Sequence, residues 1–449
     1  MVTSTAEESA ALAMNNGCDL NCGVTYLHVQ KACEDGLVSE ETITESAVRL
    51  FTTRYLLGLF DETPYDRISY LEVESEEHLA LTEKAAAESF VLLKNNGVLP
   101  LKKEKLHTLG VIGPNADSRK ALIGNYHGTA SRYVTVQEGL QDYLGDSVRI
   151  LTSVGCDLSK DRVEALACAK DRLSEARTVA EYSDAVILCL GLDETLEGEE
   201  GDTGNSYFSG DKDDLLLPEP QRQLMEALAD CGKPVILCLM AGSDIDLSYA
   251  KEHCDAIMVL WYPGGEGGRA AAKVLFGDSA PTGKLPVTFY ESLEELPDFE
   301  DYTMEGRTYR YMKGKAQYPF GYGLTYGHLE LKSAKIREKG NGAEVRVTVY
   351  NPGEREVTET VQVYVKSVES PCAPLHPALS AFGRITVQPG ETAEKTLELD
   401  ERAFTVVDEA GQRQTVSGAF EVYAGFSQPD ERSRELMGSA PVQMIFERK

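Results

Sequence analysis

The sequence has no long apolar run, an excess of acidic over basic residues and only one tryptophan. No apolar stretch of about eighteen residues occurs in the 449-residue chain, so no membrane-spanning helix is predicted. The amino end, "MVTSTAEESAALAMNNGCD", has no basic flank before an apolar core, so it predicts no secretory signal. With 73 acidic against 44 basic residues, the net charge of -29 disfavours nucleic acid and anionic membranes as partners. Neutral or cationic ligands are favoured.

The ten cysteines lie mostly in apolar segments such as "VILCLG" and "VILCLM". This pattern is typical of buried thiols in a reducing compartment, so we expect a cytoplasmic protein. Cys18 and Cys22 in "CDLNC" have the spacing of half a metal site, but no second Cys or His pair follows at the required spacing. No metal and no cofactor are predicted.

Residues 1–62 contain too few elements for a domain. "TAEESAALAM" predicts a helix, "GCDLNCG" a short strand, and "VSEETITESAVRLFTTRYLLGLFD" a second helix that ends at Gly58. We therefore expect this segment to be the end of a larger unit. Residues 63–105 are expected to form a linker and a leading helix, "HLALTEKAAAESFVLLKN", with a strongly apolar end.

Residues 106–300 alternate between apolar strands and amphipathic helices. The strand candidates include "HTLGVIG", "DAVILCLG", "KPVILCLM" and "CDAIMVLWY", and the helices include "VEALACAKDRLSEARTVAEYS" and "GGRAAAKVLFG". Such alternation predicts an α/β domain with a mainly parallel sheet covered on both faces. After a connector at 301–328, residues 329–449 alternate with period two between "NPGE" and "QPGE" turns. They predict an all-β, fibronectin type III-like sandwich with no helix of any length.

The stretch "LDETLEGEEGD" places six carboxylates in eleven residues directly after a predicted strand. Open α/β sheets bind ligands at the carboxyl ends of their strands. Crowded carboxylates raise one another's pKa, which is the condition that a glycosidase acid needs. By composition alone, a solvated acidic loop is the favoured interpretation.

A second polar loop, "IGNYHGTASRYVTVQEGL", carries Tyr126, His127, Arg132 and Tyr133. Aromatic rings beside hydrogen-bonding groups suit a sugar, and an ordinary surface loop is the equal alternative. His127 taken alone predicts a structural role.

The glycines of "WYPGGEGGRAAAKVLFG" precede a helix but match neither nucleotide-binding pattern, so they predict a tight turn and close helix packing. Trp261 stands at the end of a predicted strand, either as a core residue or as a platform for a sugar.

Taken in order, several segments resemble glycoside hydrolase family 3 over essentially the whole chain. They are "AAAESFVLLKNNGVLPL", "VIGPNAD", "IGNYHGTASRY", "GLDETLEGEEGD", "DLLLPEPQRQLMEAL", "KPVILCLMAGSDIDLSYA", "AIMVLWYPGGEGGRAAAKVLFGDSAPTGKLPVTFY", "GRTYRYMKG" and "YPFGYGLTY". The resemblance implies a (β/α)₈ barrel, an α/β sandwich and a fibronectin-like domain, so residues 1–62 resemble the C-terminal remnant of the barrel.

The resemblance also implies a retaining mechanism, in which a barrel aspartate attacks the anomeric carbon and a glutamate of the second domain protonates the leaving oxygen. The glutamate position of the family matches Glu199, with Glu197 as the second candidate, because Asp202 is followed here by Thr203 rather than Arg. No segment matches the family's Ser-Asp motif, so the nucleophile is expected upstream of Met1.

Further expectations follow from the same resemblance. The motifs are closer to the β-xylosidase and arabinosidase-like branch than to the β-glucosidase branch. Tyr126 and Tyr133 would lie beside the leaving-group subsite, and Asp19 and Asn21 would border the cleft. "GRTYRY" and "PFGYGLTY" would fix the junction of the second and third domains.

Three functional hypotheses remain open. The chain is the acid-bearing part of a hydrolase of β-linked xylosides or glucosides that needs a separate barrel polypeptide or a homo-oligomer. Alternatively, it is a truncated or degenerate carbohydrate-binding fragment. A nucleotide-binding α/β protein is disfavoured by the failed glycine patterns.

Overall fold

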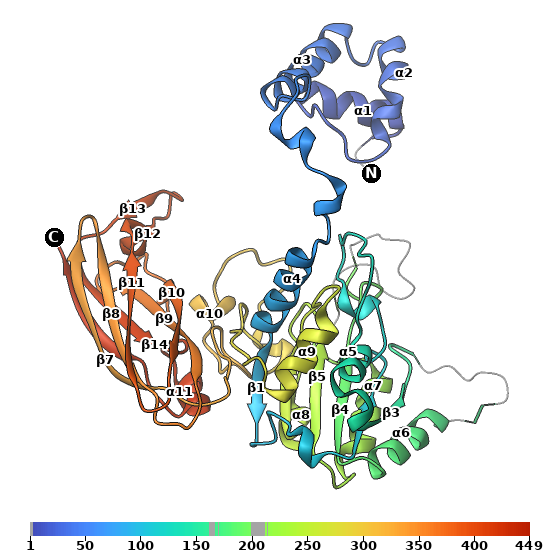
Figure 1. Cartoon of the computed structure of the whole chain (residues 1–449). Helices are drawn as coiled ribbons and strands as arrows, with labels where there is room; N and C mark the ends of the chain where they lie inside the picture. Colours follow the sequence, from blue (N-terminus) through green and yellow to red (C-terminus); the bar gives the residue numbers. More distant parts are fainter. Residues whose placement is uncertain (1–2, 161–166, 169, 199–211, 213) are drawn as a thin grey trace. The chain divides into compact units, whose positions relative to one another are not determined.

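The computed structural model describes residues 3–160, 167–168, 170–198, 212 and 214–449. The chain divides into two compact units, Met1–Ser75 and Glu76–Lys449 (Figure 1). Among the described residues, no helix combines the length and the apolar character needed to cross a membrane. All ten cysteines are free thiols.

The first unit is helical, with α1 (Ala6–Asn15), α2 (Val29–Glu34) and α3 (Glu40–Leu56). The side chains of Thr5 and Ser39 cap α1 and α3 by accepting hydrogen bonds from backbone N–H groups of the first turn. The strand expected in "GCDLNCG" is wrong, because these residues are irregular in the structure. A strand needs a neighbour for its backbone hydrogen bonds, and none of the described strands pairs with this segment.

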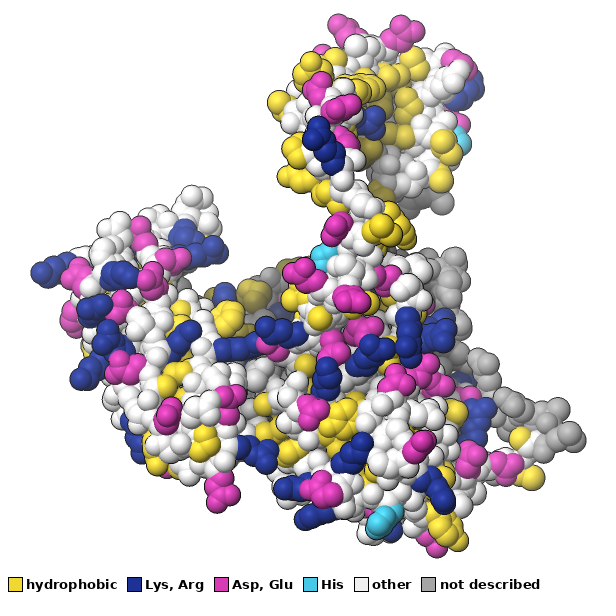
Figure 2. Space-filling view, viewed as in Figure 1, with side chains coloured by type: hydrophobic (Ala, Val, Ile, Leu, Met, Phe, Trp, Pro, Cys, Tyr) yellow, Lys and Arg dark blue, Asp and Glu magenta, His cyan; other side chains and the backbone are white. Residues whose placement is uncertain are grey.

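The core of the first unit is small. Its buried cluster consists of Ala11, Met14, Ala32 and Val38. Figure 2 shows apolar side chains gathered on the surface of this unit. The large exposed ones toward its end are Val48, Phe51, Tyr55, Leu56, Leu57, Leu59 and Phe60. Apolar helix faces that have no packed partner leave an exposed patch of this kind.

Limited trypsin digestion should cut first after Arg67, which is exposed and lies between the helices of the first unit and α4 (Glu76–Ser89). The few buried contacts of the first unit make local opening easy, so a fragment ending at Arg67 should appear early. Mass spectrometry of the digest measures this order of cleavage. Survival of the Arg67 bond after the second unit has been degraded would contradict the expectation.

The second unit begins with a six-stranded sheet in the order β1-β6-β5-β4-β2-β3. The strands β2 to β6 are parallel and β1 is antiparallel to β6, which confirms a mainly parallel sheet. The bounds are β1 Val91–Asn95, β2 Thr108–Ile112, β3 Arg149–Ser153, β4 Ala185–Gly191, β5 Val235–Met240 and β6 Ala256–Val259.

Helices cover both faces of this sheet. The buried residues of α4, α5 (Val136–Leu144) and α9 (Gly267–Phe276) belong to one apolar cluster. Those of α6 (Asp171–Glu181), α7 (Glu219–Ala229) and α8 (Ser248–His253) belong to a second cluster. A Cβ on Gly268 would lie 1.9 Å from the carbonyl oxygen of Thr135, so glycine is required where α9 approaches α5. This confirms the close helix packing that the glycine-rich segment predicts.

Two expected helices differ from the structure. The apolar end of "HLALTEKAAAESFVLLKN" is strand β1, in which Val91 and Leu92 are fully buried against β6. The edge of the sheet supplies backbone hydrogen bonds to this segment, and apolar residues cover both of its faces. These contacts stabilise a strand here more than a continued helix would be stabilised. Among the described residues of "VEALACAKDRLSEARTVAEYS", Asp171–Glu181 are helical. Residues 161–166 and 169 lie outside the described residues.

The C-terminal part is an antiparallel β-sandwich. One sheet has the order β10-β9-β14-β15, the other β11-β8-β7, and their inner faces share one apolar cluster. The bounds are β7 Glu330–Lys339, β8 Gly342–Tyr350, β9 Val357–Ser367, β10 Ala378–Val387, β11 Thr392–Leu399, β12 Thr405–Val407, β13 Arg413–Thr415, β14 Gly418–Gly425 and β15 Val442–Arg448. The expectation of no helix here is wrong. Helix α11 (Glu431–Met437) begins at Asp430, whose carboxylate accepts a hydrogen bond from Ser433 N.

The connector holds the sheet domain and the sandwich together. The amide Nε2 of buried Gln362 donates to the carbonyl oxygens of Gly321 (2.9 Å) and Phe426 (3.0 Å). In helix α10 (Thr308–Tyr311), the ring of Tyr309 stacks on Phe320 with 4.0 Å between centroids. "GRTYRY" and "PFGYGLTY" therefore contribute to the junction, as the sequence predicts.

Candidate functional site

Polar side chains gather at one edge of the parallel sheet. Because β2, β4, β5 and β6 run parallel, the residues that follow them meet at the same edge. We call this group the carboxyl-edge site. It consists of Asn115 after β2, Asp193, Glu194 and Glu197 after β4, Gly242, Ser243 and Asp244 after β5, and Trp261 and Tyr262 after β6.

The end of β4 is held in one position. A Cβ on Gly191 would lie 1.8 Å from the carbonyl oxygen of Met240, so only glycine fits where β4 leaves the sheet beside β5. Fully buried Gln221 of α7 donates to Gly191 O (2.7 Å) and accepts from Gly191 N (2.8 Å). These contacts fix the point from which the acidic loop departs.

Glu197 is anchored by three donors from two other strand ends. Its carboxylate accepts hydrogen bonds from Gly242 N (2.8 Å), the hydroxyl of Ser243 and the phenol of Tyr262. Burial, followed by the nearby Glu197 charge, raises the pKa of Tyr262, so this phenol remains a donor. Three donors from two strand ends hold this carboxylate in one position and occupy both of its oxygens. This geometry suits Glu197 as the anchor of the loop.

Glu199, the first candidate for the acid, lies outside the described residues. The described part of the acidic loop begins with Asp193, which is buried and accepts hydrogen bonds from the N–H (2.9 Å) and hydroxyl (2.6 Å) of Thr195. This turn brings the chain from β4 to Glu197. The solvated-loop interpretation therefore does not apply to Asp193 and Glu197.

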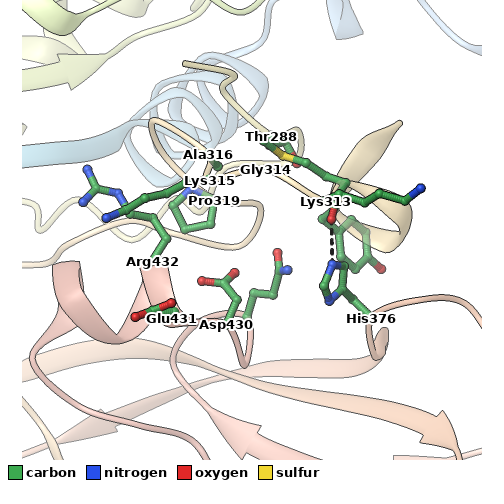
Figure 3. Close-up of a pocket in the computed structure, with 13 residues that line it drawn as sticks. Thr288, Lys313, Gly314, Lys315, Ala316, Pro319, His376, Asp430, Glu431 and Arg432 are labelled. Carbon is green, nitrogen blue, oxygen red and sulfur yellow. Dashed lines mark hydrogen bonds between the residues drawn. The ribbon is translucent and has the colours of Figure 1, made fainter. Parts of the chain in front are cut away.

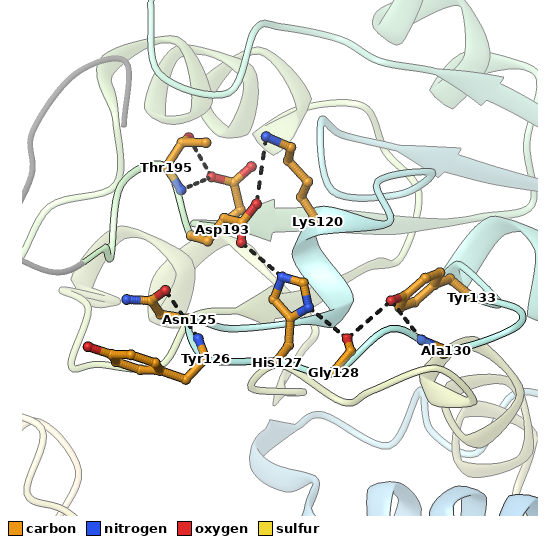
Figure 4. Close-up of polar contacts among 10 residues, drawn as sticks. Lys120, Asn125, Tyr126, His127, Gly128, Ala130, Tyr133, Asp193 and Thr195 are labelled. Carbon is orange, nitrogen blue, oxygen red and sulfur yellow. Dashed lines mark hydrogen bonds and ion pairs between the residues drawn. The ribbon is translucent and has the colours of Figure 1, made fainter. Parts of the chain in front are cut away.

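The second polar loop meets the acidic loop through His127 (Figure 4). The Nδ1 of His127 donates to the carbonyl oxygen of Gly128 (2.7 Å), and its Nε2 lies 3.2 Å from Oε2 of Glu194. The ammonium group of Lys120 lies 3.7 Å from the other oxygen of Glu194. The structure thus joins two segments that the sequence analysis treats separately.

The other predicted residues of this loop lie in different surroundings. Tyr126 has a φ of 58°, and the residue is 81% exposed. A left-handed conformation is strained for such a side chain, and strain of this kind is concentrated at functional sites. The hydroxyl of Tyr133 accepts from Ala130 N (3.0 Å) and braces the loop internally. Arg132 pairs with Asp142 of α5 at 3.6 Å, so the structure does not bring it to His127.

Asp19 and Asn21 belong to the first unit, and their contacts there are local. The carboxylate of Asp19 accepts from Arg49 (2.7 and 2.8 Å) and Ser46 (2.9 Å), and these hydrogen bonds lower its pKa. Asn21 Oδ1 accepts from Tyr26 N at 3.3 Å. Both residues organise their own loop, and their role at a cleft stays a prediction.

Trp261 is partly buried. Its indole N–H donates to Ser89 O at 3.1 Å, and its ring meets Phe289 edge-on with 6.5 Å between centroids. These contacts agree with the core alternative. Its φ of 56° turns the chain sharply between β6 and Tyr262.

Two buried ionisable residues at the edge of the site, Lys212 and Asp244, were missed by the sequence analysis. Lys212 Nζ donates to the carbonyl oxygen of Asp244 at 2.7 Å, and burial lowers the pKa of Lys212. Burial raises the pKa of Asp244 to about 7. Asp244 Oδ2 accepts from Tyr290 N (2.7 Å), while its buried Oδ1 has no partner among the described residues. A carboxyl perturbed in this way marks a candidate functional region.

Asp244, Ser243 and Tyr262 share a signal that was available in the sequence. Ser243 and Asp244 follow the apolar strand candidate "KPVILCLM", and Tyr262 is the last residue of "CDAIMVLWY", much as the acidic loop follows "DAVILCLG". Ligands bind at the carboxyl ends of parallel strands. The residues at the ends of all parallel strands are therefore candidates for the site, and not only those after "DAVILCLG".

The fold is an α/β domain with an acidic loop at its carboxyl edge, followed by a fibronectin-like sandwich. The model of the glycosyl hydrolase family 3 C-terminal domain matches residues 90–326, and that of a fibronectin type III-like domain matches residues 359–428. The first match covers more than half of the 449 residues, so the chain belongs to glycoside hydrolase family 3.

Individual relatives agree with this assignment. The chain is 28% identical to a xylan 1,4-beta-xylosidase of Xylanibacter ruminicola, over 97% of this chain and 67% of the relative. It is 31% identical to a beta-xylosidase of Formosa agariphila, over 94% of this chain and 60% of the relative. A solved family 3 exo-beta-xylosidase in complex with a xylobiose aziridine probe superposes with a TM-score of 0.82 at 28% identity. That match covers 99% of this chain and 58% of the other.

Proposed function

We propose that the chain supplies the acid/base half of a retaining glycoside hydrolase acting on β-linked xylosides or glucosides. The observation that carries this proposal is the anchoring of the acidic loop at the carboxyl edge through Glu197. Glu199 follows two residues later in the sequence. Positioning of a catalytic group lowers the entropic part of a catalytic barrier.

In this mechanism Glu199 protonates the leaving oxygen and later deprotonates the attacking water. Tyr126 and Tyr133 would lie beside the leaving-group sugar, and the His127–Glu194 contact would fix the loop that carries them. The aspartate nucleophile would come from a barrel, on the same or on a separate polypeptide, because no segment of this sequence matches the Ser-Asp motif. In retaining enzymes the two carboxyl groups lie about 5–5.5 Å apart, so barrel and loop must meet closely.

Two observations favour a neutral xyloside or glucoside over a charged substrate. The net charge of -29 repels anionic sugars, and the relatives described above are xylosidases. The alternative is a carbohydrate-binding fragment without turnover, which the missing Ser-Asp motif favours.

The test is release of nitrophenol from aryl β-xyloside and aryl β-glucoside, by the chain alone and after mixing with a barrel polypeptide of the same family. We expect turnover once a barrel is present, with β-xyloside preferred. Sugar binding without turnover in the presence of a folded, associated barrel would favour the binding fragment. Thermal stabilisation by ATP or NAD but not by xylose would favour the nucleotide-binding alternative.

A further inference from the structure

A cavity of about 320 Å³ is formed by α10 and the β-sandwich, and none of its lining residues belongs to the carboxyl-edge site. We call it the basic cavity, because its charged lining residues are Arg310, Lys366, Arg402, Arg413 and Asp400. Four basic residues against one acidic residue leave an excess of three positive charges, in a chain whose net charge is -29. The volume falls at the lower end of the range of about 300–1,000 Å³ that is typical of small-molecule sites.

The four basic residues of this cavity form no ion pair within the described part of the chain. Arg310, Arg402 and Arg413 are exposed, and Lys366 is partly buried. Among the described residues, the guanidinium group of Arg402 has no hydrogen-bond partner either. A hollow lined by charges of one sign concentrates ions of the opposite sign, so this lining attracts an anion.

Figure 3 shows a second cavity, of about 330 Å³, in which the charges are compensated. Its basic lining residues are Lys313, Lys315 and Arg432. Lys313 pairs with Glu305 at 2.6 Å, and Lys315 and Arg432 pair with Glu435 at 2.8 and 3.0 Å. Two acidic residues also line this second cavity. The lack of counter-charges therefore distinguishes the basic cavity from its counterpart in the same part of the chain.

Contacts with the chain hold two of the basic groups at the wall of the basic cavity. Arg413 Nη1 donates to Oγ1 of Thr405 at 2.8 Å, and Thr405 also lines the cavity. Lys366 Nζ donates to the carbonyl oxygen of Leu375 at 2.6 Å, directly after the lining residue Pro374. A guanidinium group carries five N–H donors and an ammonium group three. Both groups therefore keep donors for a ligand.

A phosphate group suits this lining. Guanidinium groups donate pairs of parallel hydrogen bonds to phosphate and carboxylate oxygens. An excess of three positive charges favours the dianion of phosphate over a single carboxylate, although Asp400 opposes any anion. At physiological salt the Debye length is about 8 Å, so distant acidic residues are screened and the lining itself decides which ions enter.

We propose that the basic cavity is a binding site for a small molecule that carries a phosphate group. Arg402 and Arg413 would donate hydrogen bonds to the phosphate oxygens, and Arg310 and Lys366 would add positive charge. Because the cavity shares no residue with the carboxyl-edge site, its occupation requires no turnover. Binding to the folded state alone raises its stability by mass action, so phosphate should also raise the Tm.

The test titrates the full chain with inorganic phosphate by calorimetry at fixed ionic strength. Arg402→Gln and Arg413→Gln each remove one positive charge and keep a polar side chain. The matched control is Arg355→Gln, which removes the same charge from an exposed arginine of the sandwich. Arg355 does not line the cavity, and it too forms no ion pair within the described residues. Each variant should fold, because substitutions of exposed side chains usually change stability little.

We expect saturable binding of phosphate, weakened tenfold or more by each cavity variant and unchanged by Arg355→Gln. Phosphate should raise the Tm of the wild-type chain and of the control more than that of the cavity variants. D-glucuronate, which carries a single carboxylate, should bind at least tenfold more weakly than phosphate. Equal phosphate affinity in all four proteins would overturn the proposal, as would tighter binding of D-glucuronate or no binding of phosphate to the wild-type chain. No step of this test depends on the proposed hydrolase function.

Discussion

Replacing Glu199 with glutamine is expected to lower kcat for an alkyl β-xyloside by about 10²- to 10⁴-fold in the barrel-completed enzyme, which is the usual contribution of general acid catalysis. An alkoxide is a poor leaving group, so bond cleavage depends on the proton that Glu199 delivers. Glutamine keeps the shape of the side chain but has no acidic proton. The measurement is steady-state hydrolysis by wild type and variant over a range of pH.

The leaving group separates an acid from a residue that only orders the loop. With 2,4-dinitrophenyl β-xyloside, cleavage of the glycosidic bond needs little protonation, so this step should be nearly unaffected in Glu199→Gln and appear as a pre-steady-state burst. Glu200→Gln, next in the same loop, is the matched control and should leave both substrates unchanged. Glu197→Gln removes the anchor and should slow both substrates alike. If Glu197→Gln shows the leaving-group dependence instead, the acid has been assigned to the wrong residue.

Replacing Asp244 with asparagine is expected to remove a pH dependence of stability. In the folded chain, burial raises the pKa of Asp244 from 3.8 to about 7. Between these pH values the folded state holds the proton more tightly than the unfolded state. The free energy of unfolding therefore falls as the pH rises, by up to about 4 kcal/mol. The contribution is fully present below about pH 4 and lost near pH 7.

Asparagine stays neutral, so Asp244→Asn should be more stable than wild type above pH 7 and lose that advantage toward pH 4. Urea unfolding of both proteins from pH 4 to pH 8 measures this. Asp246→Asn is the matched control. Burial acts to raise the pKa of Asp246, but hydrogen bonds from Ser248 and Gln317 lower it overall. Replacing Asp246 with asparagine should therefore destabilise the folded chain at neutral pH. An unchanged pH profile in Asp244→Asn would show that this carboxyl is ionised in the folded chain at neutral pH.

The acid was the least accessible feature from sequence alone. Six carboxylates stand within the stretch "LDETLEGEEGD", and composition alone does not separate an anchor from an acid. The structure adds that Gly242, Ser243 and Tyr262, which follow other strands, donate to Glu197, and the assignment of the acid to Glu199 stays a prediction. Such donors are distant in sequence, so no local pattern reveals them.

The sequence by itself determined the parallel sheet, its helices on both faces and the sandwich, because continuous apolar runs and period-two alternation are local consequences of burial. Only the tertiary structure decided the features that depend on a neighbour. Val91–Asn95 became a strand because β6 offered an edge, whereas "GCDLNCG" did not, because no described strand lies beside it. Local periodicity records which side chains are buried, but the partner that buries them is set by contacts between segments far apart along the chain.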